Sequence, residues 1–181
     1  GSDTLFASAG NDSLTGQATN TFGALDERDI ASYSGATSGV TATVSSTVTV
    51  TGDSSIGTDT LTNIDIISGS SFADTYTADS NFVETFVGGF TSSRNIFNGQ
   101  GGNDTITGNG DTSIAFRQAT AGVTARLASG TATGDSSVGT DTFTGVDRIG
   151  GSDFADVLTG TNTNADGREG FQGHGGHDTI D

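Results

Sequence analysis

The sequence predicts an all-β fold of the solenoid type, and three observations lead to this prediction. The composition holds only three Glu, six Leu and no Lys, so the strong helix formers are scarce. Segments of the chain repeat one another at a fixed distance, which is typical of stacked, quasi-one-dimensional proteins. Inside these segments a shorter unit returns every nine residues, a length that suits one loop and one short strand.

The longer repeat is about 82 residues, because residues 52–77 match residues 134–159 at 17 of 26 positions. Neighbouring blocks match at similar offsets. We interpret the chain as one solenoid, residues 1–181, with a partial repeat at 1–29, repeat A at 30–111 and repeat B at 112–181. A duplicated globular domain is the alternative.

The nine-residue unit consists of an Asp, any residue and then a large apolar residue. Pairs of Asp nine residues apart are Asp3 and Asp12, Asp65 and Asp74, and Asp147 and Asp156. A Gly often stands two positions before the Asp, where it allows a positive φ and close backbone approach. We expect the apolar residue to point inward from a short strand. Two units of nine residues would form one coil of about 18 residues.

Other stretches read as ordinary strands. Residues 40–44, 48–50 and 123–127 alternate with period two and are rich in β-branched side chains. Four phenylalanines stand in or beside the Gly-rich windows, and we expect them to be core side chains: Phe72, Phe97, Phe154 and Phe171.

The net charge of −16, from 22 acids and six basic residues, excludes several functions. No basic surface is available to bind nucleic-acid phosphates or to dock on an anionic membrane. The longest apolar runs are a few residues, so we expect no membrane insertion. No Ser–His–acid arrangement is readable, and we expect no enzymatic activity in this chain. Such a charge destabilises a compact chain unless cations neutralise it; otherwise the chain is disordered.

The positions of the acids favour cations over disorder, because many acids stand in Gly-rich loops. Oxygen donors at short spacing suit Ca²⁺, which takes six to eight oxygen ligands, whereas Mg²⁺ demands strict octahedral geometry. Carboxylates supply charge and exposed Gly carbonyls supply further ligands. One loop holds only part of a coordination shell, so we expect the loop of the next coil to complete it.

These loops resemble a known family. Residues 99–107, Gly-Gln-Gly-Gly-Asn-Asp-Thr-Ile-Thr, resemble the RTX (haemolysin-type) calcium-binding nonapeptide G-G-x-G-x-D-x-U-x, where U is large and apolar. Residues 173–181 are similar, and residues 7–15 resemble the motif with its first Gly lost. Residues 54–62 and 136–144 keep only its second half. The windows ending at Asp74 and Asp156 carry Phe where the motif has its later Gly.

The resemblance implies a parallel β-roll or β-helix that folds on several Ca²⁺ ions outside the bacterial cell after type I secretion. It implies first ligands at the sixth motif position and beside it, with backbone carbonyls assisting: Asp12, Asp104 and Asp178, the neighbouring Asn11 and Asn103, and Gly99, Gly101, Gly173 and Gly175. It implies a second group of acidic ligands in the degenerate windows: Asp3, Asp59, Asp74, Asp141 and Asp156.

Three functional hypotheses follow. The first is a calcium-binding structural segment of a secreted or cell-surface bacterial protein, serving as a spacer, stalk or secretion-coupled folding unit. The second is a self-assembling subunit of a surface layer or extracellular fibre, whose partners are calcium, itself or the cell surface. The third is a threonine ladder, for example at residues 58–62 or 140–144, that meets ice, ordered water or sugar. Because Thr is a favoured strand residue, the sequence alone favours an ordinary strand there.

Overall fold

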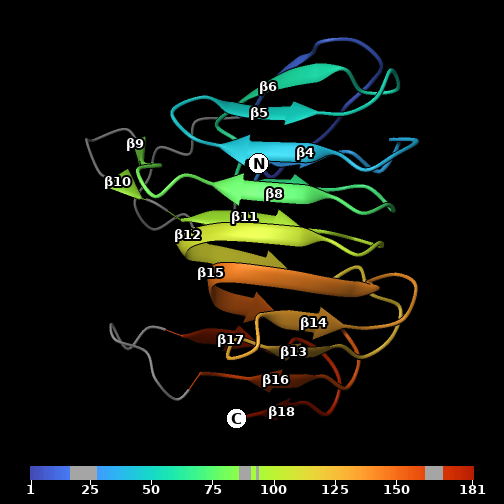
Figure 1. Ribbon diagram of the computed structural model, residues 1–181, viewed down its shortest axis with the longest axis vertical. Helices are drawn as coiled ribbons and strands as arrows, with labels where there is room; N and C mark the ends of the chain where they lie inside the picture. The colour runs from blue at the N-terminus through green and yellow to red at the C-terminus, as the bar shows by residue number, and fades with distance from the viewer. Residues whose placement is uncertain (17–27, 86–90, 93, 162–168) are drawn as a thin grey trace.

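The computed structural model describes residues 1–16, 28–85, 91–92, 94–161 and 169–181, and these residues form strands joined by turns (Figure 1). The described part of the chain contains no helix, which confirms the predicted all-β class. Two layers of strands lie back to back and stack along one axis, as in a β-roll. We call them the front sheet, which faces the viewer in Figure 1, and the back sheet.

The front sheet runs in the order β2 (Ser13–Thr15), β6 (Thr58–Thr62), β5 (Val48–Thr51), β4 (Thr41–Val44), β8 (Thr75–Ala78), the first part of β12 (Thr105–Ala115), the first part of β15 (Thr140–Gly150), β14 (Thr131–Thr133), β13 (Thr124–Arg126), β16 (Val157–Thr159) and β18 (Thr179–Ile180). The back sheet runs in the order β1 (Thr4–Phe6), β3 (Ile30–Ser32), β7 (Ile66–Ser68), β11 (Asn95–Asn98), the second parts of β12 and β15, and β17 (Gly170–Gln172). A separate antiparallel pair consists of β9 (Glu84–Thr85) and β10 (Thr91–Ser92).

Most pairings are parallel, as expected for a solenoid, but two antiparallel insertions interrupt the front sheet. Strand β5 pairs antiparallel with β4 and β6, and β14 pairs antiparallel with β13 and β15. These insertions lengthen the coils, so the predicted coil of about 18 residues is wrong as a general rule. Equivalent aspartates on neighbouring coils are separated by 47, 30, 37 and 22 residues. The repeat length of 82 residues stays a prediction.

Nine residues correspond to half a coil, as predicted, and cover the path from a back strand to a front strand. Asp3 precedes β1 in the back sheet, and Asp12 precedes β2 in the front sheet. The chain thus turns at two edges. We call the edge where it passes from back to front the Asp edge, which comprises residues 7–12, 33–40, 69–74, 99–104, 116–123, 151–156 and 173–178. The opposite edge is the return edge.

The core lies between the two sheets, and the apolar residue of each unit points into it as predicted. Ile106, Phe143 and Leu158 of the front sheet are at most 5% exposed. Tyr76 stacks on Phe97 of the back sheet, with ring centroids 4.8 Å apart and planes inclined by 30°. Burial of each such side chain contributes about 1.5–3 kcal/mol to stability.

The expectation that four phenylalanines lie in the core holds for Phe97, which is buried, and in part for Phe171, which is half-buried. It is wrong for Phe72 and Phe154, which are 45% and 46% exposed. Their backbones pack against glycines of the neighbouring coil: a Cβ at Gly102 would collide with the Phe72 carbonyl. The turn therefore presents its backbone to the next coil and the phenylalanine ring to solvent.

Glycines two positions before the Asp have the positive φ angles that the sequence predicted. Gly102 has φ +118° and Gly139 has φ +79°. The two also lie on adjacent coils, and a Cβ at Gly139 would collide with the Gly102 carbonyl oxygen. Glycine is required at residue 139 for two reasons, the left-handed backbone and the close approach of the next coil.

A matched pair of substitutions separates these two reasons. Gly110 has φ +89°, but a Cβ there would meet nothing within 4 Å. We expect Gly110→Ala to cost about 1–2 kcal/mol for the left-handed backbone alone. Gly139→Ala should cost roughly 1–3 kcal/mol more, because the coils must also move apart. Chemical denaturation in Ca²⁺ measures both values, and equal losses would contradict the close contact.

Candidate metal-binding edge

Aspartate carboxylates at the Asp edge join neighbouring coils. In each case the backbone N–H of one Asp donates a hydrogen bond to a carboxylate oxygen of the Asp on the next coil. These bonds run from Asp12 N to Asp59 Oδ1 (2.8 Å), Asp74 N to Asp104 Oδ1 (2.9 Å), Asp104 N to Asp141 Oδ1 (2.9 Å) and Asp156 N to Asp178 Oδ1 (3.0 Å). The result is an aspartate ladder in three segments: 12–59, 74–104–141 and 156–178.

The antiparallel insertions divide the ladder. At the start of the second and third segments a valine takes the place of the Asp. Val40 N donates to Asp74 Oδ1 (2.8 Å), and Val123 N donates to Asp156 Oδ1 (2.7 Å). The structure therefore brings together seven of the eight predicted acidic ligands within these segments.

Burial dominates the electrostatics of the middle segment. Asp74, Asp104 and Asp141 are at most 2% exposed. Burial, together with the charges of Asp141 and Asp74, raises the pKa of Asp104 to about 8. Burial likewise raises the pKa of Asp141 to about 7 and shifts the pKa of Asp74 upward, although backbone N–H donors oppose each shift. Three stacked carboxylates cannot all be charged here at low cost.

Two ladder carboxylates keep a buried oxygen without a hydrogen-bond partner, Asp59 Oδ2 and Asp104 Oδ2. Asp104 Oδ2 lies against Gly99, where a Cβ would collide with it. Asp59 Oδ2 lies near the Tyr33 hydroxyl. Burial raises the pKa of Asp59 and this hydroxyl opposes the shift, although neither atom reaches a hydrogen-bond geometry. A buried oxygen left unpaired is costly, and a cation would satisfy it.

Serine side chains, which the sequence analysis missed, satisfy other carboxylates. Ser70 donates its N–H to Asp74 Oδ2 and its hydroxyl to Asp74 Oδ1, both at 2.7 Å. Ser152 makes the same two bonds to Asp156, also at 2.7 Å. Ser8 binds Asp12 Oδ2 through its N–H (3.1 Å) and its hydroxyl (2.8 Å). The sequence could have indicated these serines, because Ser70 and Ser152 each stand four residues before the aspartate that they bind.

The two asparagines of the predicted ligand set bridge coils in this structure. Asn11 Oδ1 accepts the Thr58 N–H (2.9 Å), and Asn103 Oδ1 accepts the Thr140 N–H (2.8 Å). Both side chains are exposed.

The four predicted glycines pack tightly in two different ways. Gly99 and Gly173 lie against the Asp of their own turn, whereas Gly101 and Gly175 face backbone of a neighbouring coil. A Cβ added at any of these glycines would come too close to another residue. That residue is Asp104 for Gly99, Asp178 for Gly173, Ser136 for Gly101 and Asp153 for Gly175.

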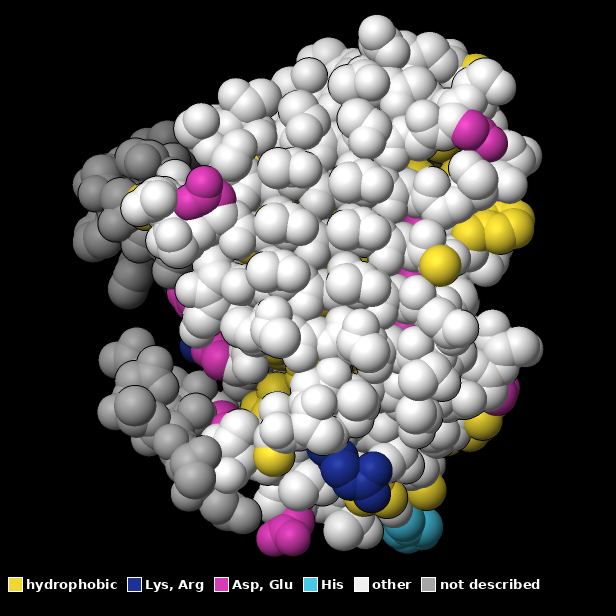
Figure 2. Space-filling model, viewed as in Figure 1, with side chains coloured by type: hydrophobic (Ala, Val, Ile, Leu, Met, Phe, Trp, Pro, Cys, Tyr) yellow, Lys and Arg dark blue, Asp and Glu magenta, His cyan; other side chains and the backbone are white. Residues whose placement is uncertain are grey.

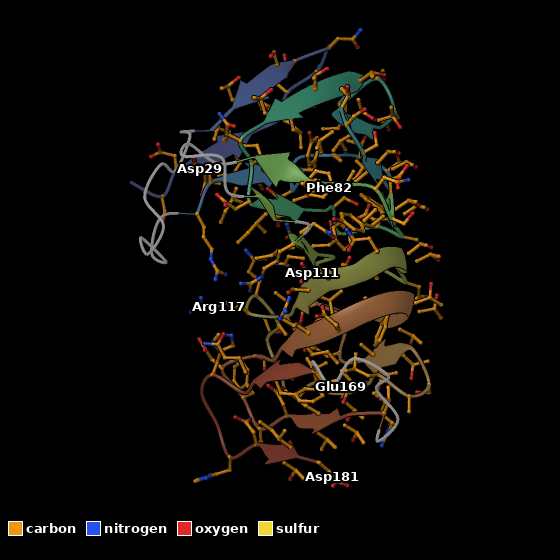
Figure 3. All side chains as sticks on the ribbon, turned by 90° about the vertical axis from the view of Figure 1, so that its left-hand side faces the viewer. Asp29, Phe82, Asp111, Arg117, Glu169 and Asp181 are labelled. Carbon is orange, nitrogen blue, oxygen red and sulfur yellow. The ribbon has the colours of Figure 1, made fainter. Side chains whose placement is uncertain are left out.

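Asp3 does not join this site, because it lies at the return edge. There a second ladder connects Asp3 N to Asp29 Oδ1 (2.9 Å) and Asp29 N to Asp65 Oδ2 (2.8 Å). The sequence analysis did not select Asp29 or Asp65, although Asp65 stands nine residues before Asp74. Figure 3 looks onto this edge, with Asp29, Asp111 and Glu169 at three heights along the axis.

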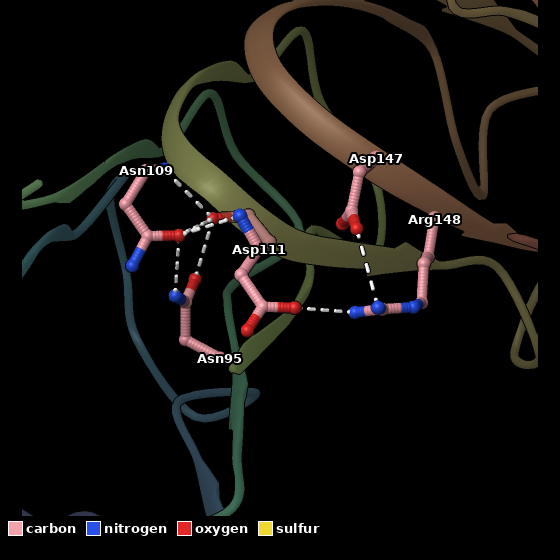
Figure 4. Close-up of polar contacts among 6 residues, drawn as sticks. Asn95, Asn109, Asp111, Asp147 and Arg148 are labelled. Carbon is pink, nitrogen blue, oxygen red and sulfur yellow. Dashed lines mark hydrogen bonds and ion pairs between the residues drawn. The ribbon is translucent and has the colours of Figure 1, made fainter. Parts of the chain in front are cut away.

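Arginine neutralises acids at the return edge. Arg148 forms ion pairs with Asp111 (2.6 Å) and Asp147 (3.3 Å), beside the hydrogen-bonded Asn95 and Asn109 (Figure 4). Burial raises the pKa of Asp147 to about 6, while the Arg148 charge opposes the shift. The Asp edge differs, because none of Asp59, Asp74, Asp104 and Asp141 is paired with an arginine in the described part of the chain.

Comparison with known families finds a similarity in two segments of the chain. The family described as "RTX calcium-binding nonapeptide repeat (4 copies)" matches residues 1–20 and 91–112. These two segments are similar to RTX calcium-binding repeats and make up 42 of the 181 residues. They contain the Asp12 and Asp104 turns, one from the first ladder segment and one from the second. No curated protein matches the chain.

The residues of the Asp edge suit Ca²⁺. The Asp edge offers oxygen donors, and the unpaired Oδ2 atoms of Asp59 and Asp104 are buried there. Among the described residues, however, no three His, Cys, Asp or Glu side chains converge on one point. An ion at this edge must therefore take backbone oxygens or water as well as carboxylates. No helix in the described part of the chain is long and apolar enough to cross a membrane.

The raised pKa values predict how metal-free protein responds to pH. The folded pKa values of Asp104 and Asp141, about 8 and 7, exceed the ordinary value of about 3.9, so the folded state holds protons that the unfolded state releases. Stability should be greatest near pH 4 and fall as the pH rises to about 8. Urea denaturation in chelator-treated buffers measures this. Asp104→Asn, which cannot ionise, should reduce the slope; an unchanged slope would contradict the assignment.

Proposed function

We propose that this chain is a structural segment of an extracellular bacterial protein and that Ca²⁺ bound at the Asp edge stabilises its fold. One observation carries the proposal: the buried carboxylates of Asp59, Asp74, Asp104 and Asp141 stack at this edge without an ion pair to a basic side chain among the described residues, in a chain of net charge −16 whose residues 1–20 and 91–112 match the RTX repeat family. Divalent cations supply the missing charge, whereas arginines supply it at the return edge.

The proposed ligands differ in the strength of their support. Asp59 and Asp104 come first, because each keeps a buried oxygen without a partner. Asp12 and Asp141 follow as their ladder neighbours, and Asp178 follows as the acceptor of the third segment, with backbone oxygens of the glycine turns. Asp74 and Asp156 have weaker support, since serines already bind both of their oxygens. Asn11 and Asn103 would have to leave their coil-to-coil bonds.

A spacer or stalk suits this architecture. The coils stack along one axis, so length increases with each coil and every coil is held mainly by its neighbours. Dependence on Ca²⁺ would couple folding to the extracellular space, where modules commonly bind calcium with dissociation constants of about 10⁻⁴–10⁻³ M. The type I secretion route that the RTX resemblance implies is part of the same proposal.

Thermal unfolding followed by circular dichroism tests the calcium dependence. We expect the β-sheet signal and the melting temperature to rise strongly between chelator and millimolar Ca²⁺, because ligands of the folded state stabilise it. Equimolar Mg²⁺ should have a smaller effect. A chain equally folded and equally stable in chelator would show that the aspartates are ordinary turn residues.

Matched variants locate the site. Asp104→Asn should diminish the stabilisation by Ca²⁺ at pH 7.5, while the same variant reduces the pH dependence of metal-free protein. Asp53→Asn is the control, because Asp53 is exposed and its carboxylate only caps a surface turn formed with Ser55 and Thr37. Equal loss in both variants would contradict a site at the ladder. Light scattering on the same samples distinguishes a monomeric spacer from an assembling subunit, whose particle size would grow.

A further inference from the structure

The outer surface of the front sheet carries threonines in two straight files that run along the axis of the solenoid. One file, across seven strands from β6 to β14, is Thr58, Thr51, Thr41, Thr75, Thr105, Thr142 and Thr131. The other, from β2 to β15, is Ser13, Thr60, Thr49, Thr43, Thr77, Thr107 and Thr144. Together these files are called the threonine face, and 13 of its 14 positions are Thr.

The outward positions of the back sheet differ in composition from the threonine face, and five of them are at most 8% exposed: Ser32, Ser68, Ile96, Asn98 and Ser113. The two outward files of the back sheet also span seven strands and contain a mixture of residue types: Thr4, Ile30, Ile66, Ile96, Ser113, Arg148 and Gly170 in one, and Phe6, Ser32, Ser68, Asn98, Ala115, Gly150 and Gln172 in the other. Only one of these 14 positions is Thr. Both sheets have strand geometry, yet threonine fills the outward positions of one sheet alone.

The threonine face is uncharged and open to solvent. All of its residues are exposed except Thr49 and Thr131, which are half-buried. Of the 13 threonine hydroxyls, only those of Thr51 and Thr131 form a hydrogen bond within the described part of the chain. Figure 2 shows this surface as columns of uncharged side chains, with acids at its margins. An uncharged face on a chain of net charge −16 is complementary to an uncharged partner.

The side chains of the threonine face repeat at fixed distances in two directions, as in a lattice. Neighbouring strands lie about 4.8 Å apart, and residues i and i+2 on one strand lie roughly 6.7 Å apart. The register is continuous through the seven strands, without a bulge between Thr105 and Thr107 or between Thr142 and Thr144. Each position offers one methyl group and one hydroxyl group at a fixed repeat in two directions.

We propose that the threonine face binds the surface of ice through water molecules ordered on its methyl and hydroxyl groups. A partner with translational order can engage every row of such a face at once, whereas a single small molecule would use only one or two rows. Small-molecule sites are also concave, while this sheet surface presents level rows. Regularly placed methyl groups confine water and regularly placed hydroxyls anchor it, so the bound water can merge with a growing crystal.

A crystalline polysaccharide is the competing partner with translational order, and the face suits it less well. No aromatic ring stands among its 14 positions to stack on sugar rings. The exposed Phe72 and Phe154 lie at the Asp edge, outside the files. Binding of the chain to crystalline cellulose or chitin is therefore an alternative outcome of the test.

The test measures inhibition of ice recrystallisation and the uptake of labelled protein into a growing ice crystal, with the 181-residue chain in millimolar Ca²⁺. We expect the unsubstituted protein to inhibit recrystallisation and to enter the ice. Thr105→Tyr, at the centre of one file, should raise the protein concentration needed for inhibition by about tenfold, because the ring separates the neighbouring rows from the ice. Thr75→Tyr on the adjacent strand should act alike.

Thr4→Tyr is the matched control, since Thr4 is an exposed strand threonine of the back sheet. It should leave inhibition unchanged. Tyrosine is a good strand residue, and circular dichroism with Ca²⁺ confirms that each variant folds. The proposal is overturned if the unsubstituted, folded protein does not affect ice at any soluble concentration, if folded Thr105→Tyr and Thr75→Tyr inhibit as well as Thr4→Tyr, or if the protein binds cellulose or chitin in place of ice.

Discussion

The hydrogen bond from a backbone N–H to the aspartate carboxylate of the next coil sets the geometry of this molecule. It occurs at Asp59, Asp104 and Asp178 at the Asp edge and in a related form at the return edge. Each bond fixes the height of one coil against the next, at the turn where the strand ladder alone would leave a backbone donor unpaired. The same arrangement buries negative charge, so the fold depends on how that charge is neutralised.

The two edges neutralise their negative charge in different ways. At the return edge Arg148 pairs with Asp111 and Asp147, so protein side chains supply the positive charge. The ladder of Asp74, Asp104 and Asp141 has no such partner among the described residues, and burial raises the pKa of each carboxyl group. Protons can neutralise these groups at low pH, and cations can do so at neutral pH. A protein stabilised in this way responds to its ionic surroundings.

Sequence reasoning predicted the local unit well and the assembly of units less well. The Asp and the inward apolar residue of a unit, such as Asp104 and Ile106, are separated by a strand period and could be read directly. The coil length could not, because the antiparallel strands β5 and β14 add residues without changing the nine-residue signal. The outward position of Phe72 depends on a glycine of another coil, and the return-edge role of Asp29 depends on pairing with Asp3. Contacts of this kind, between coils, do not produce a regular spacing of residue types along the sequence.

The threonine face shows how contacts between coils align residues that lie far apart in the sequence. Thr75, Thr105 and Thr142 each follow a ladder aspartate directly, but their distances along the chain are unequal, at 30 and 37 residues. Only the aspartate bonds and the strand register bring them into one row. The residues that could order water on the outer surface are therefore aligned by the carboxylates whose charge a cation would neutralise. Loss of that cation would disturb the lattice spacing of the face as well as the stability of the chain.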